Sequence, residues 1–252
     1  MITELFSKDY TGGAFVLFGP GHLLFLAGFV LVILLLPRLR GISAVTQRRI
    51  RVGYTIWLLL NELAIHAWKA WIGEWSAQTM LPLHLCSVFV ILNSVMMLST
   101  SRRLTQGIFE YAYFLGVGGA VQALITPEAG IYGLPHFRAW QALIAHSLIV
   151  LGPLYLAIVE GYRPYWRSIL RVMVGTNLYM LVMFGVNSLL GSNYLYIMRK
   201  PDTASLIDVM PGWPWYILVI EALGVALCVL LYLPFAISDW RRRGSKAAVV
   251  QA

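Results

Sequence analysis

Charge is what this sequence has least of. Only 12% of its 252 residues are charged, whereas 59% are hydrophobic, and the mean hydropathy is +0.73. A water-soluble domain carries about 25% charged residues, so this chain has too few to cover a soluble globule of its size. The two cysteines are also too few for a secreted disulfide scaffold. The composition excludes a cytosolic enzyme and a disordered chain, and it indicates an integral membrane protein.

Several motifs that would reveal chemistry are absent as well. The sequence has no HExxH or CxxC metal spacing, no GxSxG nucleophile turn, no P-loop and no dinucleotide motif. We therefore predict neither a metal site nor a cofactor. The net charge of +8 is concentrated at the ends of apolar segments, so it indicates membrane topology and not nucleic-acid binding.

What is present is a series of long apolar segments. A hydrocarbon core of about 30 Å requires about 20 apolar residues in a helix. We predict an all-α protein with seven transmembrane helices, forming one membrane domain over 1–240 followed by a short basic tail over 241–252. The predicted spans are 14–37, 53–73, 80–99, 106–126, 138–159, 169–190 and 214–237.

Basic residues predict how these helices are oriented. Most of the 19 basic residues fall in the first, third and fifth connections and in the tail. The positive-inside rule places these segments in the cytoplasm, and hence the N-terminus outside and the C-terminus inside. The residues concerned are Arg38, Arg40, Arg48, Arg49, Arg51, Arg102, Arg103, Arg163, Arg167, Arg171, Arg241, Arg242, Arg243 and Lys246. The outer connections 127–137 and 191–213, rich in Gly, Pro and aromatic residues, are expected to be ordered loops with short interfacial pieces.

Polar side chains within or next to the spans share one depth. At a rise of 1.5 Å per residue, most of them fall in the outer half of the membrane, where polar groups are costly and are functional candidates by default. We predict that they line a polar cavity that opens to the outer leaflet or to the outside. The candidates are Glu62, His66, Lys69, His84, Cys86, Gln122, Gln141, His146, Asn187, Asn193, Tyr194 and Glu221.

Two groups of charged candidates have alternative interpretations. Glu62, His66 and Lys69 are spaced i, i+4, i+7 and share one helix face. They form either a charged wall of the cavity or a structural network in which their charges are neutralised. Glu221 has no local partner, so it is either neutral or paired across helices with Lys69, His66 or His146.

The segment Pro82-Leu83-His84-Leu85-Cys86 contains the candidate nucleophile. We expect Pro82 to lie in the first helical turn, where its missing N–H costs nothing. A buried thiol is inert unless a base or a positive charge activates it, so Cys86 is either a packing residue or a nucleophile served by histidines at similar depth. His146 is likewise either a core histidine or a general base. Cys228 lies too deep for a disulfide with Cys86.

Three stretches carry a family resemblance. They read LPLHLCSVFVILNSVM at 81–96, HSLIVLGPLY at 146–155 and NSLLGSNYLYIMRKPDTASLI at 187–207, continuing to GWPWYI at 212–217. The chain resembles the YwaF-type bacterial integral membrane family, which is similar to the eukaryotic transmembrane protein 164 family. The resemblance implies a multi-pass protein of the bacterial cytoplasmic membrane. It also implies transfer of a fatty acyl chain onto ether-class lysophospholipids by a membrane cysteine with histidine support, and His84 and His146 match that pattern.

Two functional hypotheses follow. In the first, a phospholipid acyltransferase, Cys86 attacks an ester carbonyl or His84 activates another acceptor, and His146 is the base. The remaining polar candidates would then bind substrate. In the second, a transporter or solute-binding protein uses Glu62, His66, Lys69 and Glu221 without covalent chemistry. A sensory or assembly role is a third possibility. Membrane phospholipids are the expected partners, and the sequence does not fix the oligomeric state.

Overall fold

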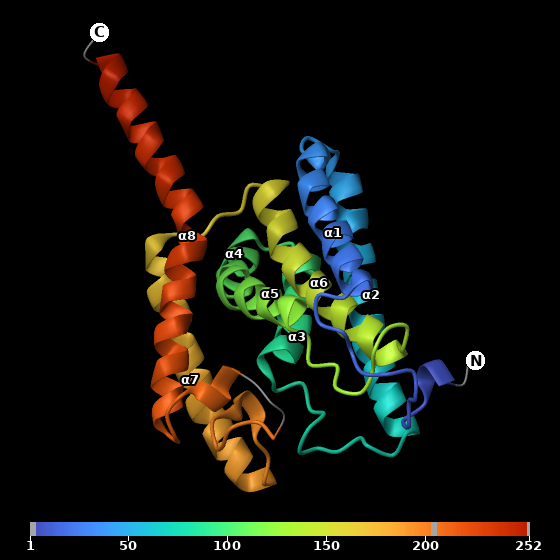
Figure 1. The fold of residues 1–252 in the computed structure, drawn as a ribbon. Coiled ribbons are helices and arrows are strands. Elements are labelled where there is room, and N and C mark those ends of the chain that lie inside the picture. The colour runs from blue at the N-terminus through green and yellow to red at the C-terminus, as the bar shows by residue number, and fades with distance from the viewer. Residues whose placement is uncertain (1–3, 203–205, 251–252) are drawn as a thin grey trace.

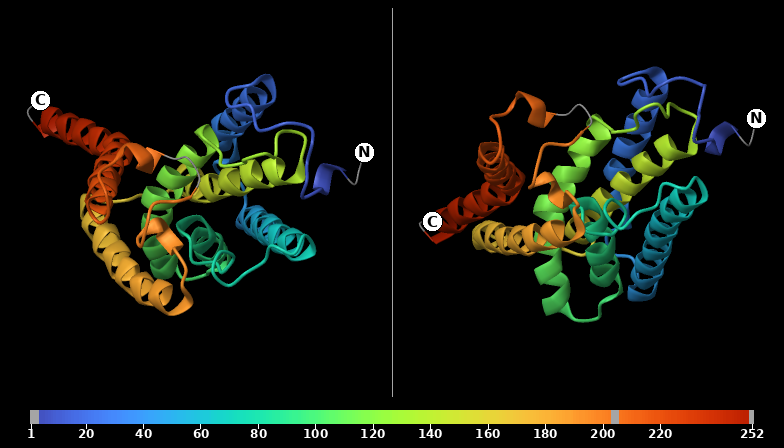
Figure 2. Two further views of the ribbon diagram at one scale, coloured as in Figure 1. Left: turned by 60° about the horizontal axis from the view of Figure 1, so that its bottom comes forward. Right: turned by 90° about the horizontal axis from the view of Figure 1, so that it is seen from below.

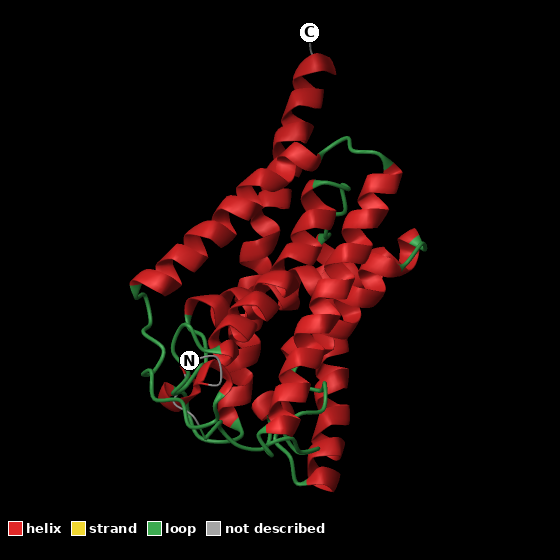
Figure 3. Ribbon diagram, turned by 90° about the vertical axis from the view of Figure 1, so that its right-hand side faces the viewer, coloured by secondary structure: helices red, strands yellow, loops and turns green. Residues whose placement is uncertain are grey.

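The protein consists of helices joined by loops. The computed structural model describes residues 4–202 and 206–250, with Leu206 and 242–250 as backbone only, and this part of the chain contains no strand (Figure 3). The predicted all-α class is confirmed over these residues. The helices are α1 (Pro20–Leu35, extended by η2, Leu36–Leu39), α2 (Ala44–Trp71), α3 (Leu85–Leu98), α4 (Arg102–Tyr111), η3 (Ala112–Gly116), α5 (Val117–Ile125), α6 (Phe137–Ile158), α7 (Trp166–Leu190) and α8 (Trp215–Val250).

Five helical segments are long and apolar enough to cross a membrane. They are Pro20–Leu39, Arg102–Ile125, Phe137–Ile158, Trp166–Leu190 and Trp215–Arg241, the second being α4, η3 and α5 in one run. α3 is apolar but has only 14 residues, which is about 21 Å and less than the hydrocarbon core. The chain is thus a multi-pass membrane protein, and the count of seven spans stays a prediction.

Three of the connections predicted to be cytoplasmic are joined at one end of the helices. The Nε of Arg40 donates to the carbonyl oxygen of Ile158 at 2.9 Å. Arg51 pairs with Glu160 at 2.9 Å and donates to the carbonyl oxygen of Ser99 at 3.3 Å. The first, third and fifth connections therefore lie together.

The N-terminal segment and the remaining connections lie at the opposite end, at the bottom of Figure 1. Lys8 pairs with Glu74 at 3.0 Å, and its carbonyl oxygen accepts a hydrogen bond from the Tyr132 hydroxyl at 3.1 Å. The Tyr194 hydroxyl donates to the carbonyl oxygen of Ala77 at 2.7 Å. The connections thus alternate between two ends, as a chain that crosses repeatedly requires. The side that faces the cytoplasm stays a prediction.

The core lies among α2, α3, η3, α5 and α6, while α7 and α8 flank it on one side (Figures 1 and 2). Buried Leu58, Phe89, Phe114 and Ile149 belong to this core. Gly118 of α5 faces α8, because a Cβ at this position would lie 2.4 Å from a side-chain atom of Leu227. The close approach of α5 and α8 therefore depends on the absence of a side chain at this position.

Three predicted boundaries were wrong. The first helix begins at Pro20 and not at residue 14, because the backbone of Gly19 is extended. The third helix begins at Leu85 and not at Pro82, because the Tyr194 hydroxyl binds the amide of Leu81 (3.0 Å) and the Tyr179 hydroxyl binds the carbonyl oxygen of Leu83 (2.8 Å). These bonds hold the segment in a non-helical form. The last helix runs through the predicted tail to Val250. Residues 251–252 of that tail and 203–205 of the predicted outer connection lie outside the described residues, and the division into domain and tail stays a prediction.

Candidate functional site

The site is built around a contact between Glu62 and His66, one turn apart on α2. The Nε2 of His66 lies 3.5 Å from the Glu62 carboxylate. The indole N–H of Trp75 donates to the Nδ1 of His66 at 3.0 Å. Because Nδ1 accepts this bond, the proton of the neutral imidazole sits on Nε2 and faces the carboxylate. The loop after α2 therefore fixes His66 in the tautomer whose Nε2–H points toward the Glu62 carboxylate.

Cys86 lies beside this pair, as the second residue of α3. Its thiol interacts electrostatically with Glu62, which also engages the hydroxyl of Ser87. A neighbouring carboxylate can act as a base that accepts the thiol proton. Cys86 is half-buried and Cys228 is buried, and both are free, as predicted.

His84 and Tyr196 complete the surroundings of the thiol. His84 is the residue that precedes α3, and its ring lies 5.0 Å from the Tyr194 ring and 5.2 Å from the Tyr196 ring, centroid to centroid. Tyr196 also interacts electrostatically with Cys86. The structure thus brings the C-terminal half of α2, the start of α3 and the loop after α7 to one place.

The loop after α7 reaches this place in a strained conformation. Leu195 and Tyr196 have φ values of 62° and 54°, a left-handed backbone that costs non-glycine residues about 1–2 kcal/mol each. Asn187 holds the loop there, since its Oδ1 accepts bonds from the amide of Tyr194 and the hydroxyl of Ser192, both at 2.7 Å. Its Nδ2 donates to the carbonyl oxygen of Tyr194 at 2.9 Å. Strain of this kind is characteristic of functional sites.

The polar side chains of Asn193 and Tyr194 in the NYLY segment form hydrogen bonds within the protein. The Oδ1 of Asn193 accepts bonds from the amides of Met198 (3.1 Å) and Arg199 (3.2 Å). The Tyr194 hydroxyl is shared between Ala77 and Leu81. Asn187, Asn193 and Tyr194 therefore position the loop that carries Tyr196, and their binding of substrate stays a prediction.

A second polar group lies on α6. Arg138 donates to the Oε1 of Gln141 at 3.0 Å, and the Nε2 of Gln141 donates to the Oδ1 of Asn61 on α2 at 3.0 Å. His146 interacts electrostatically with Arg138, and its Nδ1 donates to the carbonyl oxygen of Ala142 at 2.7 Å. This bond leaves the lone pair of Nε2 available, as a general base requires.

Sequence reasoning missed several of these residues. Arg138 was not among the predicted candidates, although it shares a helix face with Gln141 at i, i+3. Asn61 and Ser87 are neighbours of the candidates Glu62 and Cys86, and Tyr196 belongs to the family segment. Only the spacing of Arg138 and Gln141 gave a signal in the sequence.

For three predicted candidates, the described chain shows no contact with the thiol. Lys69, in the last turn of α2, pairs at 2.7 Å with Glu74, and hydrogen bonds from Lys69 and then Lys8 lower the pKa of Glu74. Gln122 is exposed. Glu221 belongs to α8, which lies on the opposite side of the molecule from α2 (Figure 1).

Within the described chain, the buried Oε1 of Glu221 has no hydrogen-bond partner, and we see no pairing of this carboxyl with Lys69 or His66. The described residues contain no group of three His, Cys, Asp or Glu side chains that could hold a metal ion.

Comparison with known proteins gives one result. No curated protein and no solved structure matches this chain. The model of the TMEM164 family matches residues 17–232, a stretch that contains Glu62, the 81–96 segment, His146 and the NYLY loop. The chain therefore belongs to the TMEM164 family.

Proposed function

We propose that this protein is a membrane-embedded acyltransferase that moves an acyl chain between phospholipids through Cys86. The observation that carries the proposal is the position of a free thiol in the first turn of α3, within electrostatic range of Glu62 and Tyr196. Family membership supports a lipid-related function, and the resemblance to an acyltransferase supplies the reaction class. We further propose seven spans with the N-terminus outside, which puts the site at the depth of lipid carbonyl groups in the outer leaflet.

In the first step, the Cys86 sulfur attacks the ester carbonyl of a donor phospholipid. A C–S bond forms, the ester C–O bond breaks, and the departing lysophospholipid alkoxide takes up the proton that the thiol released to the base. A thioester on Cys86 results. Dividing the transfer into two displacements of this kind is the advantage of a covalent carrier.

In the second step, the hydroxyl of an acceptor lysophospholipid attacks the thioester carbonyl. Its proton passes to the base, a new ester C–O bond forms and the Cys86 thiolate leaves. Glu62 lies within electrostatic range of the thiol, whereas the free Nε2 of His146 is suited to the incoming hydroxyl. We assign the two proton transfers to these groups in that order.

The transporter hypothesis fits the geometry less well. It requires Glu62, His66, Lys69 and Glu221 to act as one set, but only Glu62 and His66 are in contact, and Lys69 is paired with Glu74. A proton relay through the Glu62–His66 pair is the part of this hypothesis that the contacts support.

Trapping of the acyl-enzyme tests the proposal. The full chain, reconstituted in phospholipid vesicles, should carry a hydroxylamine-sensitive acyl group on Cys86 in an intact-mass measurement. The Cys86→Ser variant should lose the hydroxylamine-sensitive adduct, and Cys228→Ser should keep it, since Cys228 lies in the core against α5 and η3. A hydroxylamine-sensitive acyl group that persists in Cys86→Ser contradicts the proposal. If no adduct forms and a polar solute stabilises the wild type but not Glu62→Gln, the transporter hypothesis replaces it.

A further inference from the structure

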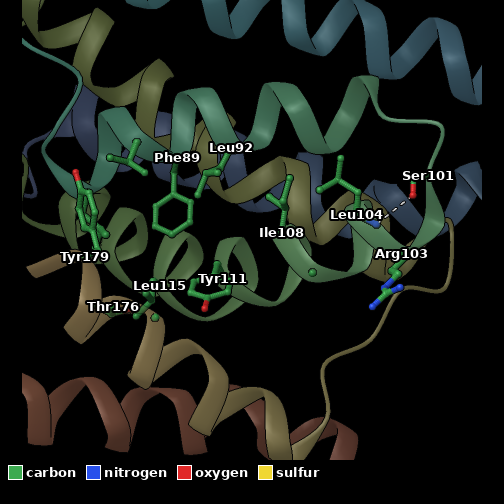
Figure 4. Close-up of a pocket in the computed structure, with 14 residues that line it drawn as sticks. Phe89, Leu92, Ser101, Arg103, Leu104, Ile108, Tyr111, Leu115, Thr176 and Tyr179 are labelled. Carbon is green, nitrogen blue, oxygen red and sulfur yellow. Dashed lines mark hydrogen bonds between the residues drawn. The ribbon is translucent and has the colours of Figure 1, made fainter. Parts of the chain in front are cut away.

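An apolar groove runs along the face of α3 that points toward α4 and α7 (Figure 4). Its volume is about 720 Å³. Tyr179 of α7 and Arg103 of α4 mark its two ends in Figure 4, and the side chains of Phe89, Leu92 and Ile108 lie between them. The groove is thus a hydrophobic channel with a cation at one end.

This groove is separate from the polar site. The α3 residues that line it are Leu85, Val88, Phe89 and Leu92, a spacing of i, i+3, i+4, i+7 that defines one helix face. Asn93, which follows Leu92, is turned toward α6, where its Nδ2 donates to the carbonyl oxygen of Ile149 at 3.2 Å. Cys86 is not among the lining residues. α3 therefore stands between two sites with different chemistry.

Arg103 is available at the end of the groove. Its side chain is exposed, and within the described chain it makes no ion pair or hydrogen bond, in contrast to the nearby Arg171, which pairs with Glu110 at 2.8 Å. A second cavity of about 670 Å³ continues from Arg103 along α4 and α7. Arg103 is also the second residue of α4, where the helix end adds positive potential.

We infer that the α3–α4–α7 groove binds an anionic glycerophospholipid, with one acyl chain along the groove and the phosphate on Arg103. An unpaired guanidinium at a membrane interface is complementary to a phosphate. The 14 residues of α3 extend about 21 Å, more than one leaflet of the hydrocarbon core at about 15 Å. A chain of ordinary length therefore fits beside α3. The inference does not depend on acyl transfer, because no group of the polar site takes part.

Gly107 offers a way to block the groove. It lines both cavities, and a Cβ added there would meet no atom within 4 Å, so a leucine side chain would project into open space. Gly28 of α1 has equally open surroundings and lies outside both cavities. Gly28→Leu is therefore a matched control for Gly107→Leu. Arg48, an exposed arginine of α2, provides the control for Arg103.

Native mass spectrometry of the full chain tests the inference. The protein is released from nanodiscs that contain phosphatidylcholine and phosphatidylglycerol. Wild type, Gly28→Leu and Arg48→Gln should retain one phosphatidylglycerol. Gly107→Leu should not retain it, and Arg103→Gln should retain about tenfold less, the effect of losing one charge-assisted contact.

Three results would overturn the inference. They are equal retention of the two lipid classes by the wild type, unchanged retention in Gly107→Leu, and equal losses in Arg103→Gln and Arg48→Gln, which would indicate a surface lipid attracted by charge alone. If Gly107→Leu does not fold, the comparison of the two exposed arginines decides the question.

Discussion

Replacement of Asn187 by alanine should release the loop that carries Tyr196. The side chain is 1% exposed and makes three hydrogen bonds, to the amide and the carbonyl of Tyr194 and to the hydroxyl of Ser192. At a net value of about 1 kcal/mol each, the loss is about 3 kcal/mol. A protein of this size shifts its Tm by about 2–4 °C per kcal/mol, so Asn187→Ala should melt about 6–12 °C lower.

The measurement is thermal unfolding in detergent followed by near-UV circular dichroism. Asn177→Ala is the matched control on α7, because Asn177 is exposed and makes one bond, to the carbonyl oxygen of Met173 at 3.0 Å. Its Tm should stay close to that of the wild type. If the two variants melt together and only Asn187→Ala loses activity, Asn187 binds substrate, as the sequence suggested, and the positioning role is wrong.

The remaining predictions concern the base, the pH dependence and the topology. His146→Ala should lower acyl transfer by about 10²–10⁴-fold if His146 is a general base, measured as the initial rate in vesicles; an unchanged rate would exclude it. Burial lowers the pKa of His136 below its ordinary 6.5. As the pH falls, the unfolded state therefore binds a proton at His136 before the folded state does. The contribution of His136 to stability is complete above pH 6.5 and is lost as the pH falls through the pKa of the folded state. His136→Asn should flatten the pH dependence of Tm in that range, and an unaltered dependence would contradict the assignment. A reporter fused after Ala252 should read cytoplasmic; an external reading would reverse the predicted orientation.

The sequence predicted those features that depend on local spacing or on the solvent. Apolar segments of span length were visible because lipid requires them, and the i, i+4 spacing placed Glu62 against His66. The general position of Cys86 near a polar group also followed from depth along the helices.

The rest depends on contacts between distant segments. The start of α3 is determined by hydroxyl groups of Tyr179 and Tyr194, about 100 residues away in the chain. The hydrogen bonds of Asn187 to Ser192 and Tyr194 are likewise not visible in the sequence, and its binding of substrate stays a prediction. The groove beside α3 follows from the placement of α4 and α7, which no pattern within one helix encodes.

The most direct test of the acyl-transfer mechanism is the exchange of a deuterium-labelled acyl chain between a donor phospholipid and a lysophospholipid. The purified full chain is placed in vesicles that hold both lipids, and the labelled product is followed by mass spectrometry. We expect exchange by the wild type and by Cys228→Ser, and none by Cys86→Ser. Equal exchange by the wild type and Cys86→Ser would contradict the role of the thiol.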